Sequence, residues 1–197
     1  MDTQPTAAPV AASAAAPGSN ITVFLCANCA RSGRVPSAAR PRPEMPDFGW
    51  PCKARQVLIP CTGRLQPEHL LKAFEAGSDA VVVVACDEEN CHNLEGSRRA
   101  KRRVEFVRQL LDEIGLGGAR LMMFYLPGSA RQDLALGVAA PAPVLSPEET
   151  AKRIAAMREA VADALKTLTP NPLRQPGEGP APHEITEELE DTDDSEE

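Results

Sequence analysis

Four short apolar runs in the central part of the chain have the length of buried β-strands: residues 21–25, 56–60, 80–85 and 120–126. The runs at 21–25 and 80–85 are the most continuous, as is typical of strands that are buried on both faces of a sheet. Such strands occur mainly in parallel sheets whose two faces are covered by helices.

Amphipathic stretches between and after these runs predict three helices. Pro67 opens the first helix, Gly77 ends it, and its apolar face holds Leu70, Leu71 and Phe74. The second spans 97–114 and stops at Gly115, with apolar positions three and four residues apart at Ala100, Val104, Val107, Leu111 and Ile114. The third begins at Ser146 in a capping-box pattern, and its apolar face consists of Ile154, Met157, Val161 and Leu165.

Alternation of strands with helices predicts an α/β fold. We expect a small four-stranded, mainly parallel sheet flanked by helices in a three-layer, flavodoxin- or Rossmann-like arrangement. The α/β domain is expected at 20–128, and a C-terminal helix at 146–168 is expected to pack on it after an Ala/Pro-rich linker at 129–145. The Ala/Pro-rich leader at 1–19 and the tail at 169–197 are predicted to be disordered.

Charge and hydropathy exclude two classes of protein. The net charge of −7 is concentrated in residues 183–197, which hold acids and no Lys or Arg, so the rest of the chain is close to balanced. A strongly basic nucleic-acid binder is therefore not expected. No apolar run is long enough for a membrane span, and the N-terminus lacks the basic start and hydrophobic middle of a secretory signal. We therefore expect a cytoplasmic protein, in which cysteines serve as ligands or redox groups more often than as disulfides.

Five of the six cysteines fall at, or just after, the ends of predicted strands: Cys26, Cys29, Cys61, Cys86 and Cys91. The carboxyl ends of parallel strands share one edge of a sheet, so these thiols can converge on one metal or cluster site. A donor set of thiolates suits zinc or an iron–sulfur cluster, and the Cys86-x4-Cys91 spacing is more usual for a [2Fe–2S] site. A cluster needs four ligands, so one of the five is spare. Cys52 precedes the second strand and is expected near the opposite edge.

Other residues near the predicted site have plainer interpretations. Gly63 and Gly96 are expected to serve tight loops, and His69 and His92 to make structural hydrogen bonds. Five basic residues lie near the start of the second helix: Arg98, Arg99, Lys101, Arg102 and Arg103. Three interpretations are open: a solvated face, a docking patch for a partner, or positive charge beside an anionic cluster. Because bases in a first turn oppose the helix dipole, a compensating anion is plausible there.

Three segments together resemble the delta subunit of methyl-viologen-reducing hydrogenase, whose family consists of hydrogenase iron–sulfur subunits. They are Cys26-Ala-Asn-Cys29, Cys61-Thr-Gly-Arg64 and the block from Cys86 to Gly96. The resemblance covers about 20–127, and all five strand-end cysteines match the family's cysteine positions. Thr62 stands where serine is usual, and Asn93 where an aromatic residue is common.

This resemblance implies a [2Fe–2S] protein that passes electrons between a hydrogenase or formate dehydrogenase module and an HdrA-like flavoprotein, the flavoprotein subunit of a heterodisulfide-reductase-like complex. Four of the five matching cysteines are then the iron ligands. No nucleophile–base pair, carboxylate dyad or phosphate-binding loop is evident, so a non-catalytic subunit of an oxidoreductase complex is expected.

Two other functions remain open from the residues. A thioredoxin-like dithiol oxidoreductase would use Cys26 and Cys29, but Gly33 and Pro36 interrupt the helix that such a motif needs, and three cysteines stay unexplained. A zinc-stabilised interaction module would use four of the same thiols as structural ligands.

Overall fold

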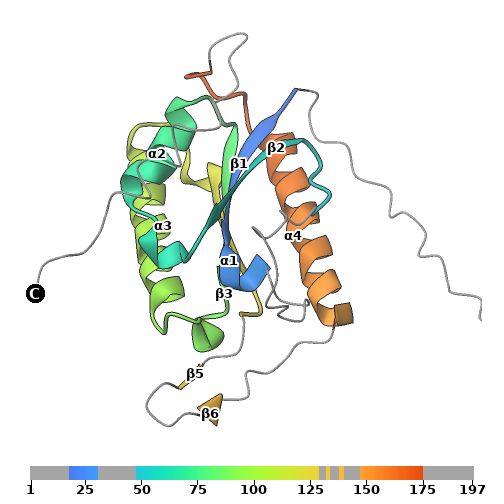
Figure 1. Cartoon of the computed structure of the whole chain (residues 1–197). Coiled ribbons are helices and arrows are strands. Elements are labelled where there is room, and N and C mark those ends of the chain that lie inside the picture. The colour runs from blue at the N-terminus through green and yellow to red at the C-terminus, as the bar shows by residue number, and fades with distance from the viewer. Residues whose placement is uncertain (1–17, 31–47, 129–131, 134–137, 140–146, 175–197) are drawn as a thin grey trace, which may run out of the picture.

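A parallel four-stranded sheet forms the centre of the molecule (Figure 1). The computed structural model describes residues 18–30, 48–128, 132–133, 138–139 and 147–174. The strands lie in the order β2-β1-β3-β4, and every neighbouring pair is parallel. Their bounds are β1 (Asn20–Cys26), β2 (Lys53–Ile59), β3 (Ala80–Cys86) and β4 (Leu121–Leu126). All four predicted strands are confirmed within a few residues.

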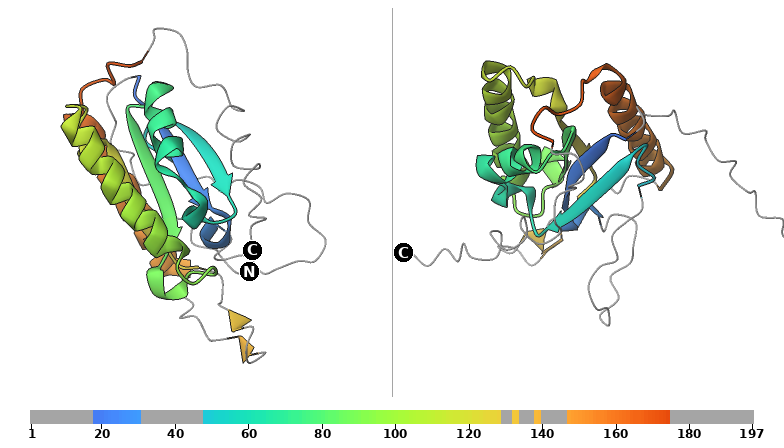
Figure 2. Two further views of the ribbon diagram at one scale, coloured as in Figure 1. Left: turned by 90° about the vertical axis from the view of Figure 1, so that its left-hand side faces the viewer. Right: turned by 90° about the horizontal axis from the view of Figure 1, so that it is seen from above.

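Helices cover both faces of this sheet, so the predicted three-layer α/β fold is confirmed. Helices α2 (Pro67–Glu75) and α3 (Gly96–Glu113) lie on one face, and α4 (Pro147–Thr167) lies on the other (Figure 2). Short elements complete the described chain: helix α1 (Ala27–Ala30) and the 3-10 turns η1 (Thr62–Arg64), η2 (Glu88–Asn90) and η3 (Gly118–Arg120). Within the described residues, none of the helices is long and apolar enough to cross a membrane.

Two apolar cores lie on either side of the sheet because alternate side chains of a strand point to opposite faces. On one side, Val23 of β1 and Val82 of β3 pack in the core that holds Val161 and Leu165 of α4. On the other, residues of β1 and β3 pack with α2 and α3: Phe24, Val81, Val83, Leu70, Phe74, Val104, Val107 and Leu111. Every residue of β1 and β3 is buried, as predicted for the two central strands.

The end of α3 departs from the prediction. Ile114, expected on the buried stripe, is 67% exposed, because α3 ends at Glu113 and the chain turns at Gly115 with a φ of 75°. A positive φ is readily adopted by glycine alone. The turn at Gly115 therefore ends α3 at Glu113, one residue before Ile114, the last apolar position of the predicted stripe.

The predicted linker contains an antiparallel pair, β5 (Gln132–Asp133) with β6 (Val138–Ala139), which no strand pattern indicated. The rest of the linker, the leader at 1–17 and the acidic segment at 183–197 lie outside the described residues.

Residues 168–174, of which 169–174 were expected to belong to the tail, pack against the amino-terminal edge of the sheet. Asn171 is buried, and its side-chain amide donates to the carbonyls of Phe74 and Ser78 at 2.8 Å each. The buried Asp79 carboxylate accepts the N–H groups of Asn20 and Asn171 at 2.9 Å each. This network joins the starts of β1 and β3, the end of α2 and the segment after α4.

Candidate metal centre

The carboxyl edge of the sheet brings cysteines from three strands together. Cys26 and Cys86 are the last residues of β1 and β3, and Cys61 follows β2, whose last residue Ile59 pairs with Cys26. Cys29 lies in α1, one helical turn after Cys26, and Cys91 follows η2. All five thiols are buried, with at most 5% of any of these residues exposed. The predicted convergence on one edge is therefore present.

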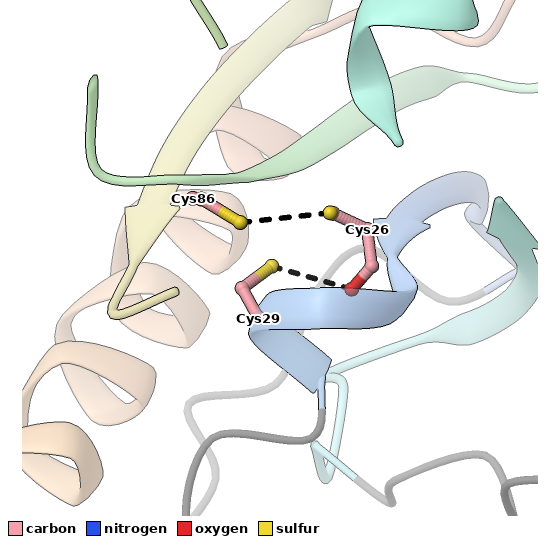
Figure 3. Close-up of side chains that lie close together, drawn as sticks. All are labelled: Cys26, Cys29 and Cys86. Atoms are coloured by element: carbon pink, nitrogen blue, oxygen red, sulfur yellow. Dashed lines mark hydrogen bonds between the residues drawn. The ribbon is translucent and has the colours of Figure 1, made fainter. Parts of the chain in front are cut away.

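Three of these sulfurs form a compact group (Figure 3). The Sγ atoms of Cys26, Cys29 and Cys86 all lie within 4.8 Å of one another, and those of Cys26 and Cys86 are 3.6 Å apart. The Cys29 thiol lies 3.4 Å from the carbonyl oxygen of Cys26 and 3.6 Å from that of Val84, so both contacts favour a protonated sulfur.

Cys61 and Cys91 adjoin this group because two loops approach each other through glycines. A Cβ added to Gly63 would lie 2.7 Å from the Cα of Gly96. A Cβ added to Gly96 would collide with the Cys61 sulfur and lie 3.3 Å from the Cys91 sulfur. Neither glycine has a positive φ, so glycine is needed at both positions because a side chain would not fit, and not because of the backbone conformation. Arg103 of α3 fixes the same loop by donating to the carbonyls of Gly63 at 2.6 Å and Leu65 at 2.8 Å.

Hydrogen bonds among the five thiols shift their pKa values in opposite directions. The pKa of Cys26 is lowered, chiefly by hydrogen bonds from its neighbours Cys29, Cys61 and Cys86. The pKa of Cys91 is lowered, chiefly by hydrogen bonds from Cys61 and Cys86. Contact with Cys26 is in turn the first cause of the raised pKa values of Cys29, Cys61 and Cys86. Each thiol thus affects the pKa of at least two others, and a cation that displaced their protons would meet several thiolates at once.

Helix α3 points its amino terminus at this group. Its first residue is Gly96, and its N-cap residue Glu95 makes no side-chain capping bond. The side chain and the backbone N–H of Ser97 both contribute to the lowered pKa of Cys91. The thiolate of Cys91 can therefore take the place of a side-chain cap, since the first N–H groups of a helix attract anions.

Basic residues of α3 lie beside the site, and several are paired. Lys101 Nζ lies 3.1 Å from Glu88, Arg98 lies 3.6 Å from the same carboxylate, and Arg99 pairs with Glu95. The three basic side chains are 49% to 60% exposed, so the group is mainly a solvated face. On the opposite side of the sheet, Arg153 of α4 donates to both oxygens of Asp87 at 3.0 Å and fixes the chain just after Cys86.

The remaining candidates stand apart from the thiol group. Cys52, half-buried, precedes β2 and lies close enough to Asp79 to be affected by its charge, which places it at the amino-terminal edge as expected. His92 is exposed. His69 is buried in α2, where its Nδ1 accepts the N–H of Gln66 at 2.9 Å, a structural role as predicted.

The sequence profile of the methyl-viologen-reducing hydrogenase delta subunit matches residues 21–139, which include all four strands of the sheet except Asn20 and all five buried thiols. The chain belongs to this family. It is 36% identical over 125 residues to an F420-non-reducing hydrogenase vhu iron–sulfur subunit of Methanocaldococcus jannaschii. The match covers 64% of this chain and 78% of that relative. The protein of the same name from Methanococcus maripaludis is 33% identical over the same coverage.

A second kind of relative contains this region as a small part of a larger protein. One subunit of the ferredoxin:CoB-CoM heterodisulfide reductase of Methanosarcina mazei is 29% identical over 106 residues, which are 54% of this chain and 13% of that protein. Similar sequence thus occurs both in separate hydrogenase subunits and within a subunit of heterodisulfide reductase.

The donor set fits an iron–sulfur cluster. Thiolate is the usual ligand of such clusters, five thiols are available for four ligand positions, and burial excludes water from the sulfurs. Sequence patterns identified the thiols and the two glycines, but they did not identify Ser97 or Arg103 as parts of the site. A serine in a first helical turn and an arginine among four other bases carry no distinguishing signal in a single sequence.

Proposed function

We propose that this chain is an electron-transfer subunit that holds a [2Fe–2S] cluster. It relays electrons between a hydrogenase or formate dehydrogenase module and an HdrA-like flavoprotein of a heterodisulfide-reductase-like complex. The observation that carries the proposal is the meeting of five buried thiols at one edge of the sheet. The family match and the relatives' names support an iron–sulfur subunit in such a complex.

A bound cluster of this type supplies one-electron redox chemistry. The chain's own residues hold the sulfurs at fixed positions, exclude water and supply hydrogen bonds to the sulfurs, the features through which a protein sets a cluster's potential. Side chains of α4 cover the site from one face of the sheet, and the start of α3 covers it from the other.

We further propose that the four ligands are Cys26, Cys61, Cys86 and Cys91. Cys61 accepts the N–H of Gly63 at 3.3 Å, and Ser97 stabilises the thiolate of Cys91. The sulfur of Cys29 instead faces two carbonyl oxygens, which disfavour a thiolate and suit a thiol. Cys29 would then be the spare cysteine.

The cluster assignment is tested by purifying the full chain without oxygen and measuring iron, acid-labile sulfide, absorption and EPR. Two irons and two sulfides per chain, with an EPR signal on reduction, are expected. Stoichiometric zinc in a colourless protein would contradict the cluster and support a structural metal site. A metal-free protein with a redox-active Cys26–Cys29 pair would support the dithiol oxidoreductase, although both thiols are buried.

The ligand set is tested by alanine variants at Cys29, Cys61 and Cys52. We expect Cys61→Ala to lose the iron and Cys29→Ala to retain it, with Cys52→Ala as a control that also retains it. Iron loss from Cys29→Ala together with iron retention by Cys61→Ala would show that Cys29 is a ligand and that Cys61 is the spare cysteine.

The relay is tested in a reconstituted mixture of hydrogenase module, loaded chain and flavoprotein. Hydrogen should bleach the flavin only when the loaded chain is present, and bleaching at the same rate without it would contradict the proposal.

A further inference from the structure

The environments of the two sulfur pairs differ. Cys26 and Cys86 form the inner pair, whose sulfurs are 3.6 Å apart at the ends of the two central strands. Cys61 and Cys91 form the outer pair, on either side of Gly96. Residues 92–95, which follow Cys91, are all exposed, so the outer pair lies beneath the surface of the molecule.

Donor groups gather around the outer pair. Ser97 is fully buried, and its hydroxyl has no hydrogen-bond partner of good geometry among the described residues. It lies in the first turn of α3, directly after Gly96, whose added Cβ would be 3.3 Å from the Cys91 sulfur. A buried hydroxyl without a partner is costly, and the Cys91 sulfur is the acceptor that the hydroxyl can reach.

Cys61 has donors of its own. The Gly63 N–H reaches its sulfur at 3.3 Å. The Cβ of Asn93 lies 3.6 Å from the place of an added Cβ on Gly96, which would itself collide with the Cys61 sulfur. Contact with Cys26 and Cys91 raises the pKa of Cys61, and the Asn93 amide acts in the opposite direction. The hydroxyl of Thr62, next to Cys61, is also buried and without a partner in the part of the chain that the structure describes.

Fewer donors from outside the thiol group reach the inner pair. The Cys26 sulfur lies 3.9 Å from the carbonyl oxygen of Pro60, and the thiol of Cys29 directs its own contacts at carbonyls. Cys26 does accept the N–H of Cys29. The balance of donors therefore lies with the outer pair, which also adjoins the amino terminus of α3 and its basic first turns.

We propose that the Ser97 hydroxyl, the Asn93 amide and the amino terminus of α3 raise the potential of the proposed cluster by donating to the sulfurs of Cys61 and Cys91. This inference rests on the proposed function and the proposed ligand set. A bound cluster would gain one negative charge on receiving an electron from the upstream module. Hydrogen bonds to the sulfurs would offset that added negative charge and so favour the reduced state.

The potential of the loaded full chain, measured by EPR-monitored redox titration, tests the donors. Ser97→Ala and Asn93→Leu should each weaken reduction by about tenfold in the equilibrium constant, a fall of about 59 mV for one electron. Ser97→Thr keeps the hydroxyl and should restore the potential. Ser78→Ala is the matched control, because it removes another buried hydroxyl, which bonds Thr22 at 2.7 Å at the far edge of the sheet.

Unchanged potentials in both donor variants would overturn the inference. Asn93 is exposed, so Asn93→Leu decides the question if Ser97→Ala does not load. A chain that binds no iron at all would refute the proposed function, whereas a loaded chain with unshifted potentials refutes only this inference.

Discussion

The absence of a side chain at Gly96 allows two loops of the candidate site to pack together. Gly96 separates the sulfurs of Cys61 and Cys91 and touches the backbone of Gly63, so the two loops close only because neither glycine has a side chain. A single atom at this position would push apart two of the proposed ligands.

Gly96→Ala should therefore reduce the iron content of the chain and lower its free energy of unfolding by about 1–3 kcal/mol through overpacking. Gly115→Ala is the matched control. Its Cβ would meet nothing within 4 Å, but its φ of 75° makes alanine strained by about 1–2 kcal/mol. Both variants should lose stability, and only Gly96→Ala should lose iron in a colorimetric assay. Full iron in Gly96→Ala would show that the close approach is not needed.

Cys52 is the cysteine outside the thiol group, and its reactivity should differ from that of an ordinary thiol. Burial, with a smaller effect of the Asp79 charge, raises its pKa from 9.0 to about 11. At pH 8 the thiolate fraction, and with it the rate of iodoacetamide alkylation, should be roughly a hundredfold below that of the same residue in the unfolded chain. Because the folded pKa is the higher one, folding stability from this residue is complete below pH 9 and is lost as the pH rises towards 11.

Mass spectrometry of the alkylated, loaded protein measures this rate at Cys52, with urea-unfolded protein as the reference. Alkylation of the folded and unfolded chains at equal rates would contradict a buried thiol.

At the scale of elements, α4 is the layer that closes one face of the sheet. Met157, Val161 and Leu165 lie in the same core as β1 and β3, and that core also contains Cys26, Cys29, Cys86 and Cys91. We propose that the helix is part of the same cooperative unit as the sheet, in spite of the segment that separates it from β4 in sequence.

Leu165→Ala should lower the free energy of unfolding by about 2–5 kcal/mol, because Leu165 is 2% exposed and the cavity cannot fill. Leu173→Ala, at a 48% exposed leucine just beyond the helix, should change it by less than about 0.5 kcal/mol. Urea unfolding followed by circular dichroism measures both. Two separate transitions in the original protein, or no effect of Leu165→Ala, would show that α4 folds apart from the sheet.

At the scale of the whole molecule, the two edges of the sheet carry different kinds of side chains. The carboxyl edge gathers thiols, whereas the amino edge gathers a polar network around the buried Asp79 carboxylate. Asp79 accepts two backbone N–H groups and also lies 3.3 Å from Arg174. The network ties the segment after α4 to the starts of β1 and β3.

Asp79→Ala should lower the free energy of unfolding by at least about 2 kcal/mol, because the N–H groups of Asn20 and Asn171 are left buried without an acceptor. Iron content at low temperature should not change, since the thiols lie at the other edge. Asp163→Ala, at a carboxylate that is 62% exposed and pairs with Lys166, is the control and should have little effect in the same thermal melts. A similar loss in both variants would contradict a specific role for the buried network.

Much of this organisation was predictable from the sequence because it follows from local patterns. Continuous apolar runs predicted the central strands, and the spacing of Val104, Val107 and Leu111 predicted the buried face of α3. Strand-end positions predicted the convergence of five cysteines, since parallel strands present their carboxyl ends together.

The rest depended on contacts between residues far apart in the chain. Three such contacts are the approach of Gly63 to Gly96, the hydrogen bonds of Arg103 to the loop after Cys61 and the burial of Asn171. Each joins segments that are distant in sequence, so no local pattern encodes it. Ile114 shows the opposite case, a residue whose spacing fits the buried stripe but which lies one position beyond the last residue of α3.

The parallel arrangement also sets a schedule for the chain during its synthesis. Cys26 and its partner Cys86 are 60 residues apart, so the inner pair cannot form until the whole of β3 has left the ribosome. Cys91 must follow before the four proposed ligands are available together. Until then, a metal site that takes sulfurs from both β1 and β3 cannot be complete. Metal binding at the proposed site would thus follow the pairing of β1 with β3.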